Sequence, residues 1–195
     1  MSDDTGPFNL FVIRQFLDVH WCNRIIDEMN QAPEAPAVVY GTEEKGTVNV
    51  RVRKVTRIAP PSAIFQHVIH KLQECMADVG KHFGRSLDKC EEPQFLRYLT
   101  GDYFVAHQDG NTGLLLSEKE LSRKVSVVIF LNSHSEVPTP STFAGGSLVF
   151  TNWRTGANSR MDGQAGTLVA FPAETTHEVI PVTRGQRFSI VSWFG

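Results

Sequence analysis

Cysteine is scarce in this sequence, and its placement excludes several classes of protein. The chain has three cysteines, Cys22, Cys75 and Cys90, an odd number without the close spacing of a metal or redox motif. A disulfide-stapled secreted domain and a cysteine zinc site are therefore not indicated. We expect reduced thiols and a cytoplasmic protein, with Cys22 and Cys75 as packing residues of helices.

Long apolar runs and an excess of one charge are also missing. No stretch is long enough to span a bilayer, and the acidic opening MSDDTGPFN lacks the apolar segment of a secretory signal. The formal net charge is −2, with 19 Lys and Arg and 21 Asp and Glu dispersed along the chain. We therefore expect neither nucleic acid nor a membrane as a partner.

One basic run, VRVRKVTR, stands out from this dispersed charge and lies on an expected strand. Its charged residues are Arg51, Arg53, Lys54 and Arg57. A solvated or edge-protecting face is the favoured interpretation of such a run. Contact with an acidic substrate is the alternative.

The first half of the chain predicts two helices. Asp18 can cap a helix that ends near Asn30, because apolar residues then fall on one stripe. Ser62 can cap a second helix that runs to Phe83 and stops at Gly84. The segment QAPEAPA is expected to be a connection. Two β segments complete this half, a short strand over residues 10–13 and a hairpin over residues 38–58.

The second half, from residue 94 onward, predicts strand after strand with short turns. This pattern fits a mainly β fold with supporting helices, in which two antiparallel sheets face each other in a double-stranded β-helix, a jelly-roll or cupin-like barrel. With 41% apolar residues, the 195 residues suit one domain. We expect residues 1–93 to form helical and hairpin support and residues 94–195 to form the jelly-roll core with the site. The long segment 110–124 is expected to rim its mouth.

The segment YLTGDYFVAHQDG contains the first candidate ligands. On a strand, successive side chains point to opposite faces, so His107 and Asp109 share a face while Gln108 points away. An imidazole nitrogen and a carboxylate oxygen begin a metal site that needs at least one more ligand from elsewhere. His177 is the best candidate. An isolated pair of this kind would otherwise be an ordinary surface strand end.

The last strand carries a candidate anion-binding residue. Alternation places Arg187, Ser189, Val191 and Trp193 on one face, toward the same interior as the ligands. A strand arginine paired at the surface is the alternative.

Several motifs in one order resemble a known family. After YLTGDYFVAHQDG come the strand VSVVIFLNS, the hairpin FAGGSLVF, the strand GTLVAFP and the run HEVIPVTRGQRFSIVSWF. From about Phe11 to Gly195 the chain resembles the iron(II)- and 2-oxoglutarate-dependent dioxygenases, and among them the prolyl-4-hydroxylase-like branch.

This resemblance implies a site and its cofactors. His107, Asp109 and His177 would be the catalytic iron ligands on one face of Fe(II), leaving three positions for 2-oxoglutarate and O2. Ascorbate is a candidate reductant.

The resemblance also implies how the cosubstrate is anchored. Arg187 would bind the far carboxylate of 2-oxoglutarate by its two-pronged donor geometry, with Ser189 and Tyr98 as further cofactor-binding residues. The family often places a tyrosine where this chain has Phe130, which cannot donate a hydrogen bond. In the resembled hydroxylases a mobile hairpin from the region of residues 38–58 closes over the substrate; an inert edge hairpin is the alternative.

The implied reaction is hydroxylation of an unactivated C–H bond with release of succinate and CO2. The branch favours a prolyl or other amino-acid residue of a peptide or protein as substrate, and a free amino acid or small metabolite is the alternative. Two further alternatives are a zinc hydrolase or isomerase on a cupin-like barrel, and a non-catalytic binding module. The sequence gives no basis for an oligomeric state.

Overall fold

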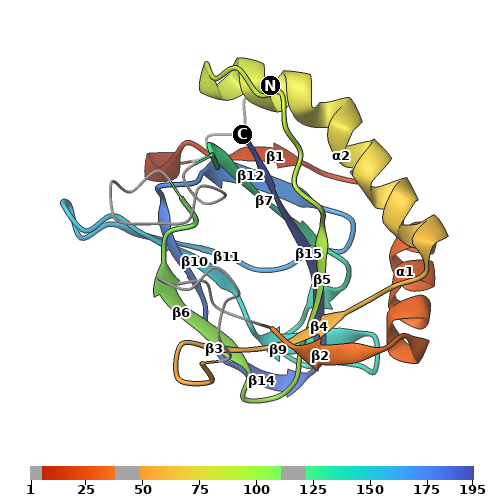
Figure 1. Cartoon of the computed structure of the whole chain (residues 1–195). Helices are drawn as coiled ribbons and strands as arrows, with labels where there is room; N and C mark the ends of the chain where they lie inside the picture. The colour runs from red at the N-terminus through yellow and green to blue at the C-terminus, as the bar shows by residue number, and fades with distance from the viewer. Residues whose placement is uncertain (1–5, 38–48, 111–121) are drawn as a thin grey trace.

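Two antiparallel sheets face each other across a barrel, and both long helices lie outside it (Figure 1). The structure is a computed structural model and describes residues 6–37, 49–110 and 122–195. The strands of the larger sheet are β1 (Phe11–Ile13), β2 (Glu34–Pro36), β4 (Thr56–Ile58), β5 (Gln94–Tyr98), β7 (Val125–Phe130), β12 (Leu168–Pro172) and β15 (Arg187–Phe194). They lie in the order β1-β12-β7-β15-β5-β4-β2.

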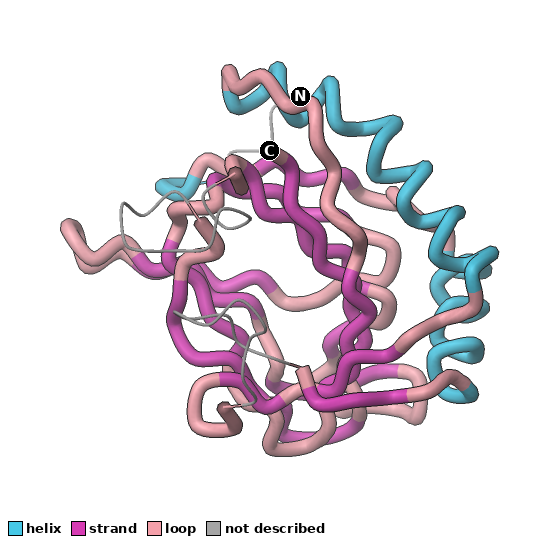
Figure 2. Tube along the Cα trace, in the orientation of Figure 1, coloured by secondary structure: helices cyan, strands magenta, loops and turns pink. Residues whose placement is uncertain are grey.

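The smaller sheet forms the opposite wall of the barrel (Figure 2). Its strands are β3 (Arg53–Lys54), β6 (Tyr103–His107), β10 (Leu148–Thr151), β11 (Asn158–Met161) and β13 (Thr176–Val179). They lie in the order β11-β10-β13-β6-β3. A short third sheet, in the order β14-β9-β8, consists of β8 (Ser133–His134), β9 (Thr142–Gly145) and β14 (Val182–Gly185). The predicted mainly β fold with two supporting helices is confirmed.

Helix α1 (Val19–Gln31) begins where the sequence predicts. The Asp18 carboxylate accepts a hydrogen bond of 2.7 Å from the backbone N–H of Trp21, which satisfies one of the free donors of the first turn. The buried stripe of this helix consists of Cys22, Ile25 and Met29. Cys22 is therefore the packing residue that we expected.

Helix α2 (Ser62–Phe83) ends as predicted but begins differently. Gly84 stops it in the left-handed conformation, with φ 62°. The predicted Ser62 cap is wrong, because Pro61 occupies the cap position in extended geometry and no side chain accepts from the first turn. Ser62 is itself the first helical residue. Among the described residues, no helix is long and apolar enough to cross a membrane.

Strand β7, in the interior of the larger sheet, is buried on both faces, which explains its mostly apolar sequence. Val127 and Ile129 join the cluster that includes the helices, whereas Val128 and Phe130 join the cluster inside the barrel. Alternation along one strand therefore links two cores. Ser126 shares the inward face with Val128 and Phe130, because side chains two residues apart on a strand point the same way.

The N-terminal β segments differ from the predicted hairpin over residues 38–58. Residues 38–48 lie outside the described ranges, as do 111–121 of the expected rim segment. Strand β3 pairs with β6 in the smaller sheet, whereas β4 pairs with β2 and β5 in the larger one. The predicted connection QAPEAPA contains β2, because its backbone extends an edge next to β4.

The thiols give a direct test of the helix packing. All three cysteines are unpaired, and burial raises the pKa of Cys22 to about 11 and that of Cys75 to about 12. Because only the thiolate reacts, we expect Cys22 and Cys75 to resist a disulfide reagent in the native protein and to react after denaturation. Absorbance during labelling measures this, and rapid native modification of Cys22 would contradict the packing.

Candidate active site

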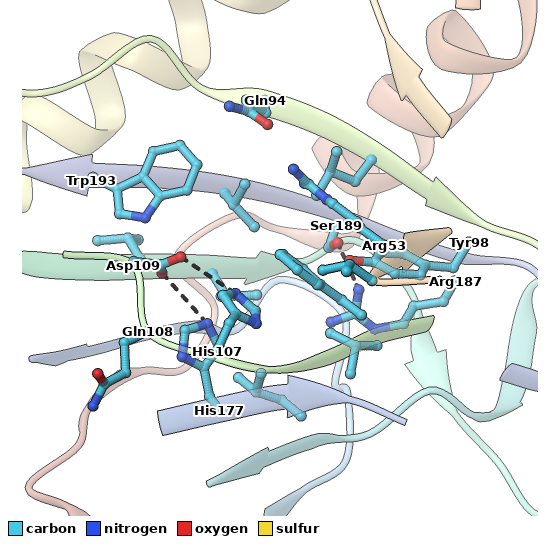
Figure 3. Close-up of a pocket in the computed structure, with 18 of the residues that line it drawn as sticks. Arg53, Gln94, Tyr98, His107, Gln108, Asp109, His177, Arg187, Ser189 and Trp193 are labelled. Carbon is cyan, nitrogen blue, oxygen red and sulfur yellow. Dashed lines mark hydrogen bonds and ion pairs between the residues drawn. The ribbon is translucent and has the colours of Figure 1, made fainter. Parts of the chain in front are cut away.

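Three side chains converge where β6 and β13 pair. His107, the last residue of β6, lies directly opposite His177 of β13, and Asp109 follows two residues after His107. One ligand atom from each residue lies within 4.8 Å of the other two. The Asp109 carboxylate faces both imidazoles, with Oδ1 3.4 Å from His107 Nε2 and Oδ2 3.5 Å from His177 Nε2 (Figure 3).

Backbone carbonyls orient both imidazole rings. The Nδ1–H of His107 donates to the carbonyl of Val105 at 2.8 Å, and the Nδ1–H of His177 donates to the carbonyl of Thr175 at 2.9 Å. Each ring therefore presents the lone pair of Nε2 toward the other ligand atoms. Two oriented imidazoles and one carboxylate form a donor set that suits a divalent metal and leaves open positions.

The protonation states of the site also suit a metal. Burial opposes the charge of Asp109, but His177, His107 and the Ser126 hydroxyl hold its pKa well below the usual range. Burial, reinforced by His107, lowers the pKa of His177 to about 4 against the attraction of Asp109. At neutral pH the carboxylate is ionised and His177 is neutral, the forms in which both can bind a cation.

Ser126 supports the carboxylate from the inward face of β7. Its hydroxyl donates to Asp109 Oδ2 at 2.6 Å and so fixes the carboxylate. We expect Ser126→Ala to weaken metal affinity roughly 10- to 100-fold, the usual effect of losing such a supporting contact. Titration with Mn(II) measures this.

Ser147→Ala is the matched control for Ser126→Ala. Ser147 is also a buried serine whose hydroxyl donates to an aspartate, Asp162, at 2.5 Å, but it does not contact the candidate metal ligands. Equal metal affinities of the two variants would show that Ser126 has no special role.

A cavity of about 180 Å³ extends from these three residues into the barrel. Figure 3 shows His107, Asp109 and His177 toward one end and Tyr98, Ser189 and Arg187 toward the other. Arg187, Ser189, Val191 and Trp193 all line this cavity, in agreement with strand alternation along β15.

Arg187 is a buried cation at the inner end of the cavity. Its side chain is 1% exposed, and its Nη1 donates to Ser189 Oγ at 2.7 Å. The guanidinium carbon lies 5.0 Å from the ring centre of Tyr98 and 5.2 Å from that of Phe130. Among the described residues no carboxylate pairs with it and its Nε has no partner, and burial lowers its pKa. Such a group is stabilised by an anion that enters the cavity.

Gly146 allows this arginine to pack closely. It has φ +62°, and a Cβ there would lie 2.9 Å from Val182 Cγ2 and 3.0 Å from Arg187 Cδ. Gly145 and Gly146 form the turn of the hairpin FAGGSLVF, and both have positive φ. The turn also makes room for the Arg187 stem.

Sequence reasoning missed a buried ion pair beside the ligands. Arg123 Nε and Nη2 donate to the two carboxylate oxygens of Glu91 at 2.7 and 3.1 Å. The Arg123 guanidinium lies 3.7 Å from the ring centre of Trp193 and holds the indole in the cavity wall. The inward position of Trp193 was predictable from β15, but nothing in the sequence pairs Glu91 with Arg123.

The solvated interpretation of Arg53 is wrong. This residue is 7% exposed and lines the cavity, because β3 joins the smaller sheet beside β6 with Arg53 opposite Phe104. Its guanidinium carbon lies 4.8 Å from the centre of the Phe104 ring. Arg51, Lys54 and Arg57 of the same run are exposed as expected.

The sequence match identifies the family. Residues 93–195 match the 2OG-Fe(II) oxygenase superfamily, and this range is more than half of the 195-residue chain. The chain belongs to this family, whose description names Fe(II) and 2-oxoglutarate. The donor set and the buried Arg187 fit both groups.

Curated relatives are hydroxylases of the PKHD type. The chain is 34% identical to one from Paraburkholderia phytofirmans over 101 residues, which covers 52% of this chain and 41% of the relative. It is 27% identical to one from Burkholderia ambifaria over 173 residues, which covers 88% of this chain and 73% of the relative. The match with the first relative therefore spans about two fifths of that protein.

Solved structures share the fold. A prolyl-4-hydroxylase from Pseudomonas putida has a TM-score of 0.72 at 22% identity, covering 98% of this chain and 95% of its own. A prolyl hydroxylase from Trichoplax adhaerens, in complex with a hypoxia inducible factor peptide fragment, has a TM-score of 0.69 at 17% identity, covering 98% and 85%. The predicted double-stranded β-helix is confirmed, and solved structures that share it include prolyl hydroxylases.

Proposed function

We propose that this protein is a 2-oxoglutarate-dependent hydroxylase that uses Fe(II) and O2. The observation that carries the proposal is the pairing, within one cavity, of the His107, Asp109 and His177 donor set with the buried Arg187 guanidinium. A zinc hydrolase would need the three donors but has no use for a buried cation at the inner end.

The residues of the cavity have distinct tasks in this proposal. His107, Asp109 and His177 hold the metal, and the carbonyls and hydroxyl behind them fix their orientation. Arg187 and Ser189 bind the far carboxylate of 2-oxoglutarate, with the Tyr98 ring beside them. When bound, iron and 2-oxoglutarate supply with O2 the oxidising power for hydroxylation, and succinate and CO2 leave.

We propose a prolyl or other amino-acid residue of a peptide or protein as the substrate. The names of the PKHD-type relatives and the peptide complex of the Trichoplax neighbour support a hydroxylase acting on such a residue. The Trp193 ring, held by Arg123 beside the metal ligands, gives the cavity an apolar wall that suits a small ring. A cytoplasmic location is supported by the three unpaired cysteines.

A spectroscopic experiment tests the reaction class before any substrate is known. Fe(II) and then 2-oxoglutarate are added to the protein without oxygen, and a weak visible charge-transfer band is expected only with both present. No band would favour a zinc enzyme or a non-catalytic module.

Peptides containing proline are then incubated aerobically with the loaded protein, and mass spectrometry is expected to show a gain of one oxygen matched by succinate. Conversion of free amino acids alone would favour the small-molecule substrate.

A further inference from the structure

A second buried guanidinium lines the same cavity as Arg187. Arg53 enters from β3, outside the matched range 93–195 and within the half of the chain expected to give only support. Figure 3 shows it in the pocket close to Ser189 and Tyr98. The family match therefore assigns it no role.

The two guanidiniums contact different parts of the cavity wall. Arg187 lies against Tyr98 and Phe130 and bonds to Ser189, at the inner end. Arg53 lies over Phe104, whose ring stacks on the His107 imidazole with centres 3.6 Å apart and an interplanar angle of 18°. Only one aromatic ring therefore separates the Arg53 guanidinium from a candidate metal ligand.

Local structure fixes the direction of the Arg53 side chain. The next residue, Lys54, points the other way, and its Nζ pairs with Asp102 Oδ1 at 3.0 Å. The Tyr103 hydroxyl donates to the backbone carbonyl of Val50 at 3.1 Å, which ties the approach to β3 to β6. Because Lys54 and the backbone that leads into β3 are both held, strand alternation directs the Arg53 side chain into the barrel.

Charges from both ends of the cavity act on Arg53. Burial lowers its pKa, Tyr98 and Asp109 act in the opposite direction, and Arg57 and Arg123 add repulsion. Arg187, in contrast, is influenced only by burial and Tyr98. The Phe104 ring beneath the Arg53 guanidinium is the contact that connects this arginine to the metal-binding end.

We propose that Arg53 is a second anchor for 2-oxoglutarate and donates to the carboxylate that lies at the metal, while Arg187 binds the far carboxylate. This inference rests on the proposed function. 2-Oxoglutarate carries a carboxylate at each end, and the cavity presents two buried guanidiniums on different parts of its wall, Arg187 against Tyr98 and Arg53 over the Phe104 ring that stacks on His107. Arginine suits this task because its planar donors can bond a carboxylate oxygen while the stem packs against a ring.

The test combines residue changes with a change of ligand. 2-Oxopentanoate has the same chain as 2-oxoglutarate but a methyl group in place of the far carboxylate. Both acids are titrated anaerobically into Fe(II)-loaded protein, and the visible band gives each Kd. Arg53→Met is expected to weaken both acids by the same factor, at least about tenfold, since each loses a charged hydrogen bond. Arg187→Met is expected to weaken 2-oxoglutarate alone.

Controls separate binding from folding. Arg57→Met changes an exposed arginine on β4 and is expected to leave both dissociation constants unchanged. Circular dichroism and the Mn(II) affinity report whether Arg53→Met keeps its fold and metal site. If that variant does not fold, Arg53→Lys serves instead, because it keeps the charge but loses the planar donors and is expected to weaken both acids severalfold.

Each contrary outcome has a distinct meaning. Unchanged binding of both acids by a folded Arg53 variant would overturn the inference and leave the proposed function intact. Weakening of 2-oxoglutarate alone would place Arg53 at the far carboxylate and overturn the assignment to the metal end. If the iron-loaded unmodified protein gives no band with 2-oxoglutarate, the proposed function fails first, and this inference with it.

Discussion

An Asp109→Asn variant is expected to lose both tight metal binding and turnover. The change keeps the shape of the side chain but removes the negative charge that faces both imidazoles at 3.4 and 3.5 Å. The loss of Mn(II) or Fe(II) affinity should exceed the 10- to 100-fold typical of a supporting contact, because a direct ligand is removed. Metal titration and succinate release coupled to substrate measure the two effects.

Asp78→Asn controls for the charge change at an exposed position of α2. This variant should bind metal and turn over as the unmodified protein does. If Asp109→Asn keeps full metal affinity, the carboxylate is not a ligand, and the three-donor centre proposed for this cavity is wrong.

A Glu91→Gln variant is expected to destabilise the fold by about 3 to 5 kcal/mol, the usual effect of breaking a buried ion pair from one side. The side chains of Glu91 and Arg123 are only 4% and 5% exposed. In the variant, the buried Arg123 guanidinium stays charged but faces a neutral amide in place of the Glu91 carboxylate. Urea denaturation gives the free energy of unfolding. We also expect altered emission from Trp193, because Arg123 lies 3.7 Å from its ring centre.

The neighbouring Glu92 provides the matched control because it is exposed. Glu92→Gln should change the free energy of unfolding by no more than about 0.5 kcal/mol. The double variant Glu91→Gln/Arg123→Met should recover part of the stability, since it removes both charges. Similar stabilities for Glu91→Gln and Glu92→Gln would contradict the importance of this ion pair.

Alternation along strands was the most reliable guide from sequence to structure. It predicted that His107 and Asp109 share a face and that Arg187, Ser189, Val191 and Trp193 line one interior, and the structure has both arrangements. The convergence of His177 on this pair depended on the family resemblance, because strand pairing across about 70 residues is not encoded in local spacing. The roles of these residues in metal and cosubstrate binding stay predictions.

Other parts of the site could not be predicted because tertiary pairing decides them. Strand alternation in VRVRKVTR separates Arg53 from Lys54, but it cannot say which of the two faces the barrel. That choice follows from the pairing of β3 with β6. Alternation along β7 puts Ser126 on the same face as Val128 and Phe130, yet its bond to Asp109 depends on a neighbouring segment that its own sequence does not specify.

The pairing of His107 with His177 has a consequence for how the protein matures. The ladder between β6 and β13 shifts register between His177 and Val179, immediately after the paired imidazoles. A slip of one residue would turn one imidazole to the opposite face, so only correctly paired chains would present the three donors proposed to bind the metal. The time course of cobalt absorbance during refolding would therefore report when these two distant strands pair.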